Sequence, residues 1–213
     1  MKEEKTDKLF YEREMLRLGA QYIAGVDEVG RGPFAGPVVA AAVILPLDDK
    51  SLIEGIDDSK ALKEKERERL AALIRERAVA YQICEEDNRV IDRINILQAT
   101  KLCMKRAVEQ LCVQPDVVFV DGNFKIDVSL PQQSIIKGDA LSYSVGAASV
   151  LAKVYRDALM TEMDKVYPGY GFAKHKGYGT KMHREAIKEL GLCEIHRRTF
   201  IKKPSDGQGK ERP

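Results

Sequence analysis

The chain has 213 residues, of which 44% are hydrophobic, and this is enough for one domain with a substantial core. It carries 35 basic and 33 acidic residues, so attraction to nucleic acid would have to come from a local basic surface. No apolar run approaches the length of a membrane span and the N-terminus has no apolar signal segment, so we expect a cytoplasmic protein that does not associate with membranes.

The pattern of apolar and turn residues predicts an initial pair of strands, followed by strands that alternate with helices. Residues 22–29 and 36–45 are predicted strands, and the segment GRGPF between them favours an antiparallel hairpin. The other predictions are helices over 3–20, 60–78, 93–112 (capped by Asp92), 143–166 and 180–190, and strands over 78–84, 116–122 and 133–139. This order indicates an α/β fold, a mixed sheet with helices on its faces.

The composition changes after the long predicted helix. Residues 167–183 are rich in glycine, aromatic and basic residues, and we expect a small surface module there. Residues 1–166, with an N-terminal helix in 1–20, would form the main domain, and 167–201 a small C-terminal helical part. The polar segment 202–213 contains proline and glycine, and we expect it to be disordered.

Acidic residues end three apolar runs, in the segments GVDE, VFVDG and IIKGD. If the strands are neighbours, Asp27, Glu28, Asp121 and Asp139 converge, and like charges would raise one another's pKa. Hard divalent cations relieve such repulsion, and a cluster of this kind supports two-metal phosphoryl transfer. The alternative is that each acid caps a helix or closes a turn. Adjacent strand residues face opposite sides, so Asp27 and Glu28 share a site only if the strand ends or bulges there.

The glycines after these acids raise a second possibility, a phosphate-binding loop. Gly30, Arg31 and Gly32 lack the Lys-Ser/Thr of a P-loop, and Pro33 and the following strand do not fit a dinucleotide fingerprint. The cysteines and histidines do not complete a zinc spacing, so a metal would need oxygen ligands. The glycines instead suit close approach of the backbone to a sugar or a phosphate.

The segment GVDEVGRGPFAGPVVAAAVIL resembles the N-terminal signature of the ribonuclease HII family. The later segments that agree in order and type are DSKAL, VDGN, KGD, SVGAASVLAKVYRD, HKGYGT and HRRTF. The resemblance covers roughly residues 22–200. It implies a ribonuclease H-like fold and an endonuclease that nicks the RNA strand of a hybrid, or an embedded ribonucleotide, on its 5′ side. The cut would leave 3′-hydroxyl and 5′-phosphate ends.

The same resemblance maps the family's catalytic, metal-binding acids onto Asp27, Glu28, Asp121 and Asp139. These are the acids already identified at the strand ends, and they would hold Mg²⁺ or Mn²⁺, two ions per site. Asp157 is left outside this set, as a structural partner of Arg156. The histidines are assigned to structural or substrate-surface roles, because two-metal chemistry requires no histidine.

Substrate recognition is mapped in the same way. The positions expected to bind the substrate are Gly30, Arg31, Gly32, Lys60, Lys153 and Tyr178. Backbone groups of the glycine-arginine-glycine segment would meet the ribose 2′-hydroxyl, the group that distinguishes RNA from DNA. The ring of Tyr178 would stack on the sugar that follows the ribonucleotide, and the two lysines would contact phosphates.

The expected partners are an RNA–DNA hybrid or a DNA duplex that contains ribonucleotides, bound by a monomer. Two other functions fit parts of the pattern. A related DNA nuclease would share the acids, but it would have no use for a reader of the 2′-hydroxyl. A non-catalytic nucleic-acid binding module would need basic residues only, and acids near a phosphate would weaken its binding.

Overall fold

The computed structural model describes residues 7–56, 59 and 62–201. One five-stranded sheet forms its centre, and the strands in spatial order are β3 (Ala80–Glu86), β2 (Val38–Ile44), β1 (Ile23–Val29), β4 (Val117–Asp121) and β5 (Gln132–Ile135). β2 is antiparallel to both β1 and β3, while β4 is parallel to β1 and to β5. The α/β prediction with a mixed sheet, including the antiparallel β1–β2 hairpin, is confirmed.

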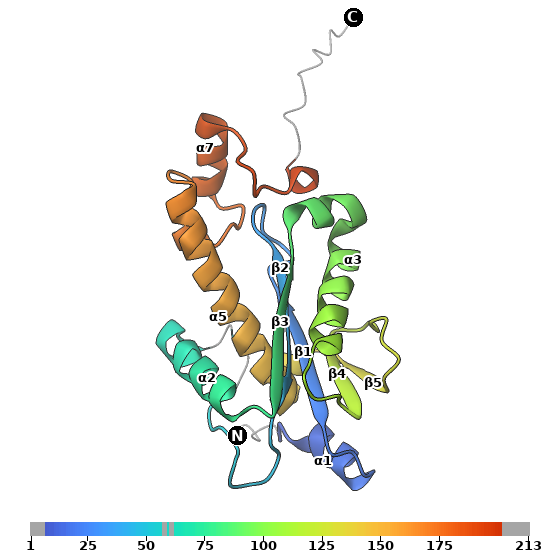
Figure 1. Cartoon of the computed structure of the whole chain (residues 1–213). Coiled ribbons are helices and arrows are strands. Elements are labelled where there is room, and N and C mark those ends of the chain that lie inside the picture. Colours follow the sequence, from blue (N-terminus) through green and yellow to red (C-terminus); the bar gives the residue numbers. More distant parts are fainter. Residues whose placement is uncertain (1–6, 57–58, 60–61, 202–213) are drawn as a thin grey trace, which may run out of the picture.

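Helices cover both faces of this sheet (Figure 1). α2 (Glu64–Arg77) and α5 (Tyr143–Val166) lie on one face, and α3 (Asn88–Glu109) lies on the other. The remaining helices are α1 (Phe10–Arg17), α4 (Gly138–Leu141), α6 (Phe172–His175), α7 (Lys181–Leu190) and the 3₁₀ turn η1 (Arg198–Phe200). No helix within the described part of the chain is both long and apolar enough to cross a membrane.

The uninterrupted apolar run of β2 follows from these two layers. Val39, Ala41 and Val43 pack in the core under α2 and α5, whereas Val38, Ala40 and Ala42 pack in the core under α3. Every residue of β2 is buried, because both faces of the strand are covered. A strand with one exposed face would instead have alternated apolar and polar residues.

Helix α5 approaches β1 so closely that β1 requires a glycine. A Cβ built on Gly25 would lie 2.1 Å from the carbonyl carbon of Ser144, in the first turn of α5. The same turn binds α1, because the buried carboxylate of Glu12 accepts hydrogen bonds from the Ser142 hydroxyl at 2.6 Å and the Ser144 amide at 2.9 Å. The N-terminal helix thus docks on the core at the start of α5.

Several predicted boundaries differ from the structure, and two of the differences change the role of an acidic residue. Tertiary contacts explain the first. α3 begins at Asn88, and its cap is Asp87, which accepts from the amide of Val90 at 2.8 Å. The predicted cap, Asp92, instead accepts from the amides of Arg198 and Thr199, so it binds the C-terminal part to α3.

The second wrong boundary is the strand predicted over 133–139. β5 ends at Ile135, and Lys137 has a φ of 58°, which turns the chain into the short helix α4. A residue in the left-handed region interrupts strand geometry. Asp139 therefore lies on a helix and not at the end of a strand.

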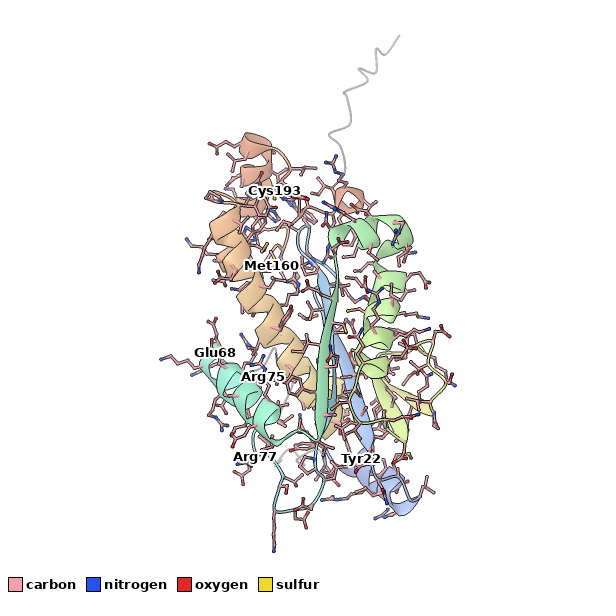
Figure 2. The ribbon with its side chains drawn as sticks, viewed as in Figure 1. Tyr22, Glu68, Arg75, Arg77, Met160 and Cys193 are labelled. Carbon is pink, nitrogen blue, oxygen red and sulfur yellow. The ribbon has the colours of Figure 1, made fainter. Side chains whose placement is uncertain are left out.

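The C-terminal part packs against the far end of α5 and against the β1–β2 connection. Its apolar cluster contains Ala35, Met160, Tyr170, Phe172 and Ala186, with Cys193 at its edge. Figure 2 shows Met160 on α5 and Cys193 at this end of the molecule. Backbone hydrogen bonds join the same segments, including Phe34 N to the Gly177 carbonyl at 2.8 Å. The predictions for residues 1–6 and 202–213 lie outside the described residues.

The contact between α5 and β1 gives the first prediction. Gly25→Ala should lower the free energy of unfolding by about 3 kcal/mol, because backbone of α5 must move to admit the new methyl group. Urea denaturation measures this change. Gly32→Ala is the control, since a Cβ there meets only the Tyr178 ring, at 3.6 Å, and its stability should match that of the unmodified protein. Equal stability of the two variants would contradict the packing argument.

Candidate active site

Three carboxylates meet where β1 and β4 end. Ligand oxygens of Asp27, Glu28 and Asp121 all lie within 4.8 Å of one another. β1 and β4 are parallel neighbours, so their carboxyl ends lie at the same edge of the sheet. The geometry thus brings together three of the four acids that the sequence predicted to converge.

Adjacent residues Asp27 and Glu28 reach this group without a bulge in the strand. The register between β1 and β2 runs unbroken as far as Val29, opposite Val39. Pairing between β1 and β4, however, stops at Val26, one residue before the acids. The flank of β1 is open beyond this point, and both side chains can extend around the end of β4.

The group is electrostatically unfavourable in the absence of cations. Burial raises the pKa of Asp27 well above its usual range, and the charges of Glu28 and Asp121 raise it further. Burial also raises the pKa of Glu28, although the guanidinium of Arg31, whose Nη1 lies 3.3 Å from Glu28 Oε1, opposes the rise. Acids with raised pKa values in one cluster are typical of functional sites.

The donor set fits a hard divalent cation. Glu28 Oε2 is buried and has no hydrogen-bond partner within the described structure, which leaves it available as a ligand. All the oxygens offered are carboxylate oxygens, the type that Mg²⁺ and Mn²⁺ prefer. A cation there would also neutralise the repulsion among the three acids.

Asp139 lies next to this group but is not one of the three. It is 8% exposed and accepts from the amide of Ala140 at 3.0 Å. The preceding residue, Gly138, donates its amide to Asp121 Oδ1 at 2.6 Å, so the start of α4 is fixed directly to the carboxylate cluster. Helix α4 therefore carries Asp139 to the edge of the site.

Ser149 on α5 is a site residue that the sequence reasoning missed. Its hydroxyl hydrogen-bonds to the Asp27 carboxylate and lies 2.8 Å from the Ser59 hydroxyl. When Asp27 is ionised its carboxylate can only accept, so Ser149 then donates to Asp27 and accepts from Ser59. A serine in a helical run of small residues carries no signal of this role, which depends on how α5 packs on β1.

Lys153 lies one turn beyond Ser149 on α5, on the same side of the helix. Its ammonium binds Asp157 at 2.8 Å, and Arg67 lies 4.0 Å from the same carboxylate. The predicted pairing of Asp157 with Arg156 is not what these contacts show. Lys60 lies outside the described residues.

The glycine-arginine-glycine segment adopts a conformation that depends on two buried arginines. Arg197 donates to the carbonyls of Gly30 at 2.6 Å and Arg31 at 2.9 Å. Gly30 has a φ of +91°, and a Cβ on it would lie 2.2 Å from Nε of Arg156, so this glycine is required by packing. Arg156 itself donates to carbonyls of the same loop, including Pro37 at 2.9 Å.

This anchoring fixes the direction of the loop's amides. In a trans peptide the carbonyl and the following N–H point in opposite directions. The carbonyls of Gly30 and Arg31 point inward to Arg197, so the amides of Arg31 and Gly32 point away from it. Tyr178 stands beside them, with its ring 3.6 Å from the Cβ position of Gly32 and 42% of its surface exposed.

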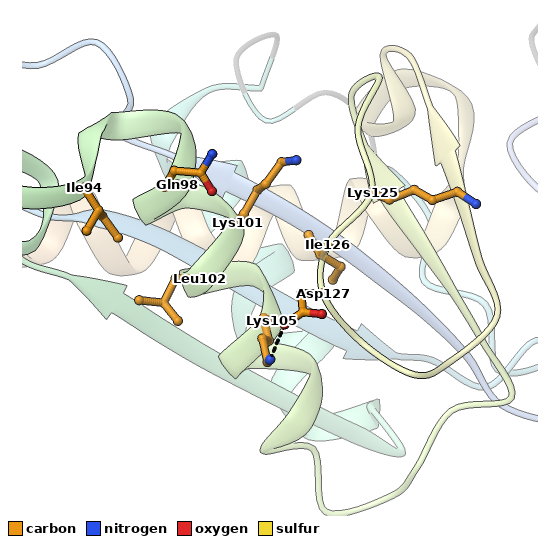
Figure 3. Close-up of a pocket in the computed structure, with 8 residues that line it drawn as sticks. All are labelled: Ile94, Gln98, Lys101, Leu102, Lys105, Lys125, Ile126 and Asp127. Carbon is orange, nitrogen blue, oxygen red and sulfur yellow. Dashed lines mark hydrogen bonds and ion pairs between the residues drawn. The ribbon is translucent and has the colours of Figure 1, made fainter.

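A surface hollow of about 700 Å³ lies apart from these residues, between α3 and segment 125–127 (Figure 3). Lys101, Lys105 and Lys125 line it, and Lys105 binds Asp127 at 2.7 Å. The three clustered carboxylates are not among its lining residues. The candidate site is therefore defined by the strand ends and not by this hollow.

The raised pKa values give a prediction about stability. A carboxyl whose pKa is higher in the folded state stabilises the fold at low pH, and this contribution is lost as pH rises through the raised pKa. In chelator, the stability of the protein should fall as pH rises above the usual aspartate range. Asp27→Asn should remove much of this fall and raise Tm near neutral pH by about 2–4 °C, the effect of roughly 1 kcal/mol in a chain of this size.

Thermal denaturation across pH, with chelator and with Mg²⁺, measures the effect. Mg²⁺ should raise the Tm of the unmodified protein and leave that of Asp27→Asn nearly unchanged. The control is Asp116→Asn, because the amides of Tyr22 and Gln21 lower the pKa of Asp116, and its contribution is instead lost as pH falls. A lower Tm for Asp27→Asn than for the unmodified protein, in chelator at neutral pH, would contradict the argument that repulsion among the three carboxylates destabilises the fold.

The chain is similar to known proteins over most of its length. The family model described as ribonuclease HII matches residues 24–203. A ribonuclease HII of Acetivibrio thermocellus is 55% identical over 192 residues, which are 90% of this chain and 74% of the relative.

Two solved structures are also similar. The first is the complex of PCNA with ribonuclease HII from Archaeoglobus fulgidus, with a TM-score of 0.74 and 25% identity over 86% of this chain and 97% of that one. The second is Bst-RNase HIII in complex with Mn²⁺, which shares the fold with a TM-score of 0.60 and 21% identity over 83% of this chain and 65% of that one. The chain therefore belongs to the ribonuclease HII family, whose members are metal-dependent ribonuclease H endonucleases.

Proposed function

We propose that this protein nicks the RNA strand of RNA–DNA hybrids and single ribonucleotides embedded in duplex DNA. The cut falls on the 5′ side of the ribonucleotide and leaves 3′-hydroxyl and 5′-phosphate ends. The observation that carries the proposal is the position of the carboxylate cluster beside a loop that directs two amides outward. A single short segment, Asp27 to Gly32, thus supplies groups for cleavage and for recognition.

Asp27, Glu28 and Asp121 would hold two Mg²⁺ or Mn²⁺ ions, and Asp139 would complete the ligand set from α4. When bound, such ions activate a water for in-line attack and stabilise the leaving oxygen. Ser149 keeps Asp27 oriented through its hydrogen bond, and the Gly138 amide does the same for Asp121. Since these partners are already in place, the ligands need little rearrangement before the reaction.

Recognition would come from the amides of Arg31 and Gly32 and from the ring of Tyr178. A ribose 2′-hydroxyl can accept from a backbone N–H, which a deoxyribose cannot do at that position. The exposed Tyr178 ring beside Gly32 offers an apolar face to the next sugar. Lys153 would approach a phosphate, and Lys60 would be a second phosphate contact.

The same proposal extends to the organisation of the chain. Residues 1–166 would be the catalytic domain and residues 167–201 the substrate-binding part, since Tyr178 belongs to the latter. We place the protein in the cytoplasm, acting as a monomer on duplex nucleic acid.

A single substrate set tests the reaction. A DNA duplex with one ribonucleotide should be nicked 5′ to it with Mg²⁺ or Mn²⁺ and left intact in chelator. Asp27→Asn and Asp121→Asn should each lower the rate by more than about 100-fold, because even outer-shell partners of a metal are worth roughly 10–100-fold. Gel analysis of end-labelled strands measures both. Cleavage that persists in chelator, or equal cutting of an all-DNA duplex, would exclude the proposal and favour a different nuclease.

The recognition groups give a separate prediction. Tyr178→Ala should lower kcat/KM on the single-ribonucleotide duplex by about tenfold, the scale of a stacked aromatic contact, while the Tm increase produced by Mg²⁺ stays the same. The control is Tyr155→Ala, because Tyr155 is a similarly exposed tyrosine of α5. A comparable loss of metal stabilisation in Tyr178→Ala would show that the tyrosine supports the metal site instead.

A further inference from the structure

Three buried histidines in the C-terminal part have no task in the metal chemistry. His183 and His196 are 0% and 1% exposed, and His175 is 8% exposed. His175 and His183 stack with their ring centroids 4.5 Å apart. Buried polar rings of this kind are retained where each nitrogen has a hydrogen-bond partner.

The partners determine which nitrogen of each ring carries the proton. His183 Nδ1 lies 3.0 Å from the carbonyl oxygen of Tyr178, which can only accept, so this nitrogen donates. His183 Nε2 is then the acceptor of a neutral ring, and it lies 3.0 Å from Nε2 of His196, which must donate. His196 Nδ1 in turn accepts from the amide of Cys193 at 2.9 Å.

These contacts form one directed chain of hydrogen bonds, which we call the imidazole relay: Cys193 amide, His196, His183, Tyr178 carbonyl. Both rings must be neutral for it to exist. Protonation of His183 would place two hydrogens between the facing Nε2 atoms, and protonation of His196 would place a hydrogen on Nδ1, where it would face the amide hydrogen of Cys193. Burial lowers the pKa of His183 to about 4 and also lowers that of His196, which agrees with neutral rings.

One end of the relay is the carbonyl of Tyr178, and the ring of Tyr178 lies beside Gly32. Its other end belongs to the segment 193–197, in which Arg197 follows His196 directly. Arg197 donates to the carbonyls of Gly30 and Arg31, as described above. One short segment therefore holds the backbone of Tyr178 through two imidazoles and holds the glycine-arginine-glycine loop through a guanidinium.

We propose that His183 and His196 are positioning residues for ribonucleotide recognition, which fix the distance between the Tyr178 ring and the outward amides of Arg31 and Gly32. The inference rests on the proposed function, because it assigns a purpose to the position of Tyr178. A ribonucleotide that is contacted by the Tyr178 ring on one side and by the two amides on the other needs a fixed distance between these groups. Small displacements of groups that position a substrate reduce reaction rates strongly. No charge or metal ligand enters the relay.

The test is a double-mutant cycle with kcat/KM on the single-ribonucleotide duplex. His183→Ala should lower kcat/KM by about tenfold, the scale of one buried hydrogen bond. His183→Asn, whose side-chain amide can donate from near the position of Nδ1, should recover most of the loss. In a Tyr178→Ala background, His183→Ala should change kcat/KM by less than about twofold, because residues that act through one another are not additive.

Ala186→Gly is the matched control for simple loss of stability. Ala186 lies on the same helix and in the same apolar cluster but makes no contact in the relay. The Ala186→Gly substitution should lower Tm without causing the tenfold loss in kcat/KM. If His183→Ala costs the same factor with and without Tyr178, or if Ala186→Gly reproduces its kinetic loss at an equal Tm, the positioning role is wrong.

A measurement on the unmodified protein keeps the inference testable even where a variant fails to fold. Nitrogen-15 chemical shifts of the imidazoles should show His183 protonated at Nδ1 and His196 at Nε2, both neutral at pH 7. The opposite tautomer at either ring would overturn the relay whatever the activity. If Tyr178→Ala leaves kcat/KM unchanged, the positioning role fails while the nuclease assignment, which rests on the carboxylates, stands.

Discussion

The close packing of α5 on β1 is the contact on which the rest of the molecule depends. Gly25 allows the first turn of the helix to touch the strand at Ser144. From that contact the helix runs along the sheet and delivers three side chains in turn: Ser149 to Asp27, Arg156 to the β1–β2 connection, and Met160 to the C-terminal core. A shift of α5 would therefore disturb the carboxylates, the recognition loop and the C-terminal part together.

The carboxylate cluster is a place where stability is reduced in favour of chemistry. Asp27, Glu28 and Asp121 repel one another in a buried setting, and the hydrogen bond from Ser149 and the charge of Arg31 compensate only in part. Functional sites commonly break local rules that the remainder of a protein obeys. Here the surrounding sheet, in which β2 next to β1 is buried on both faces, supplies the rigidity that holds the acids in place.

Two buried guanidinium groups solve a related problem at the recognition loop. A loop with a positive φ at Gly30 cannot pair its carbonyls as a strand does, and unpaired buried carbonyls are costly. Arg156 and Arg197 donate hydrogen bonds to those carbonyls. The carbonyls in turn provide acceptors for the N–H groups of each buried guanidinium, whose geometry is planar and fixed. The outward direction of the amides at Arg31 and Gly32 is a consequence of this inward anchoring.

The sequence by itself determined the elements, because apolar periodicity and turn residues are local properties. A buried strand lies within the predicted run 36–45, over Val38–Ile44, and Asp27 and Asp121 were identified by their predicted places at strand ends. Tertiary structure decided the rest. Asp92 serves the C-terminal part instead of capping α3, because a distant amide competes for the same carboxylate. Ser149 became a partner of Asp27 only because α5 crosses β1 at a glycine, and no local pattern encodes a contact between segments more than 100 residues apart.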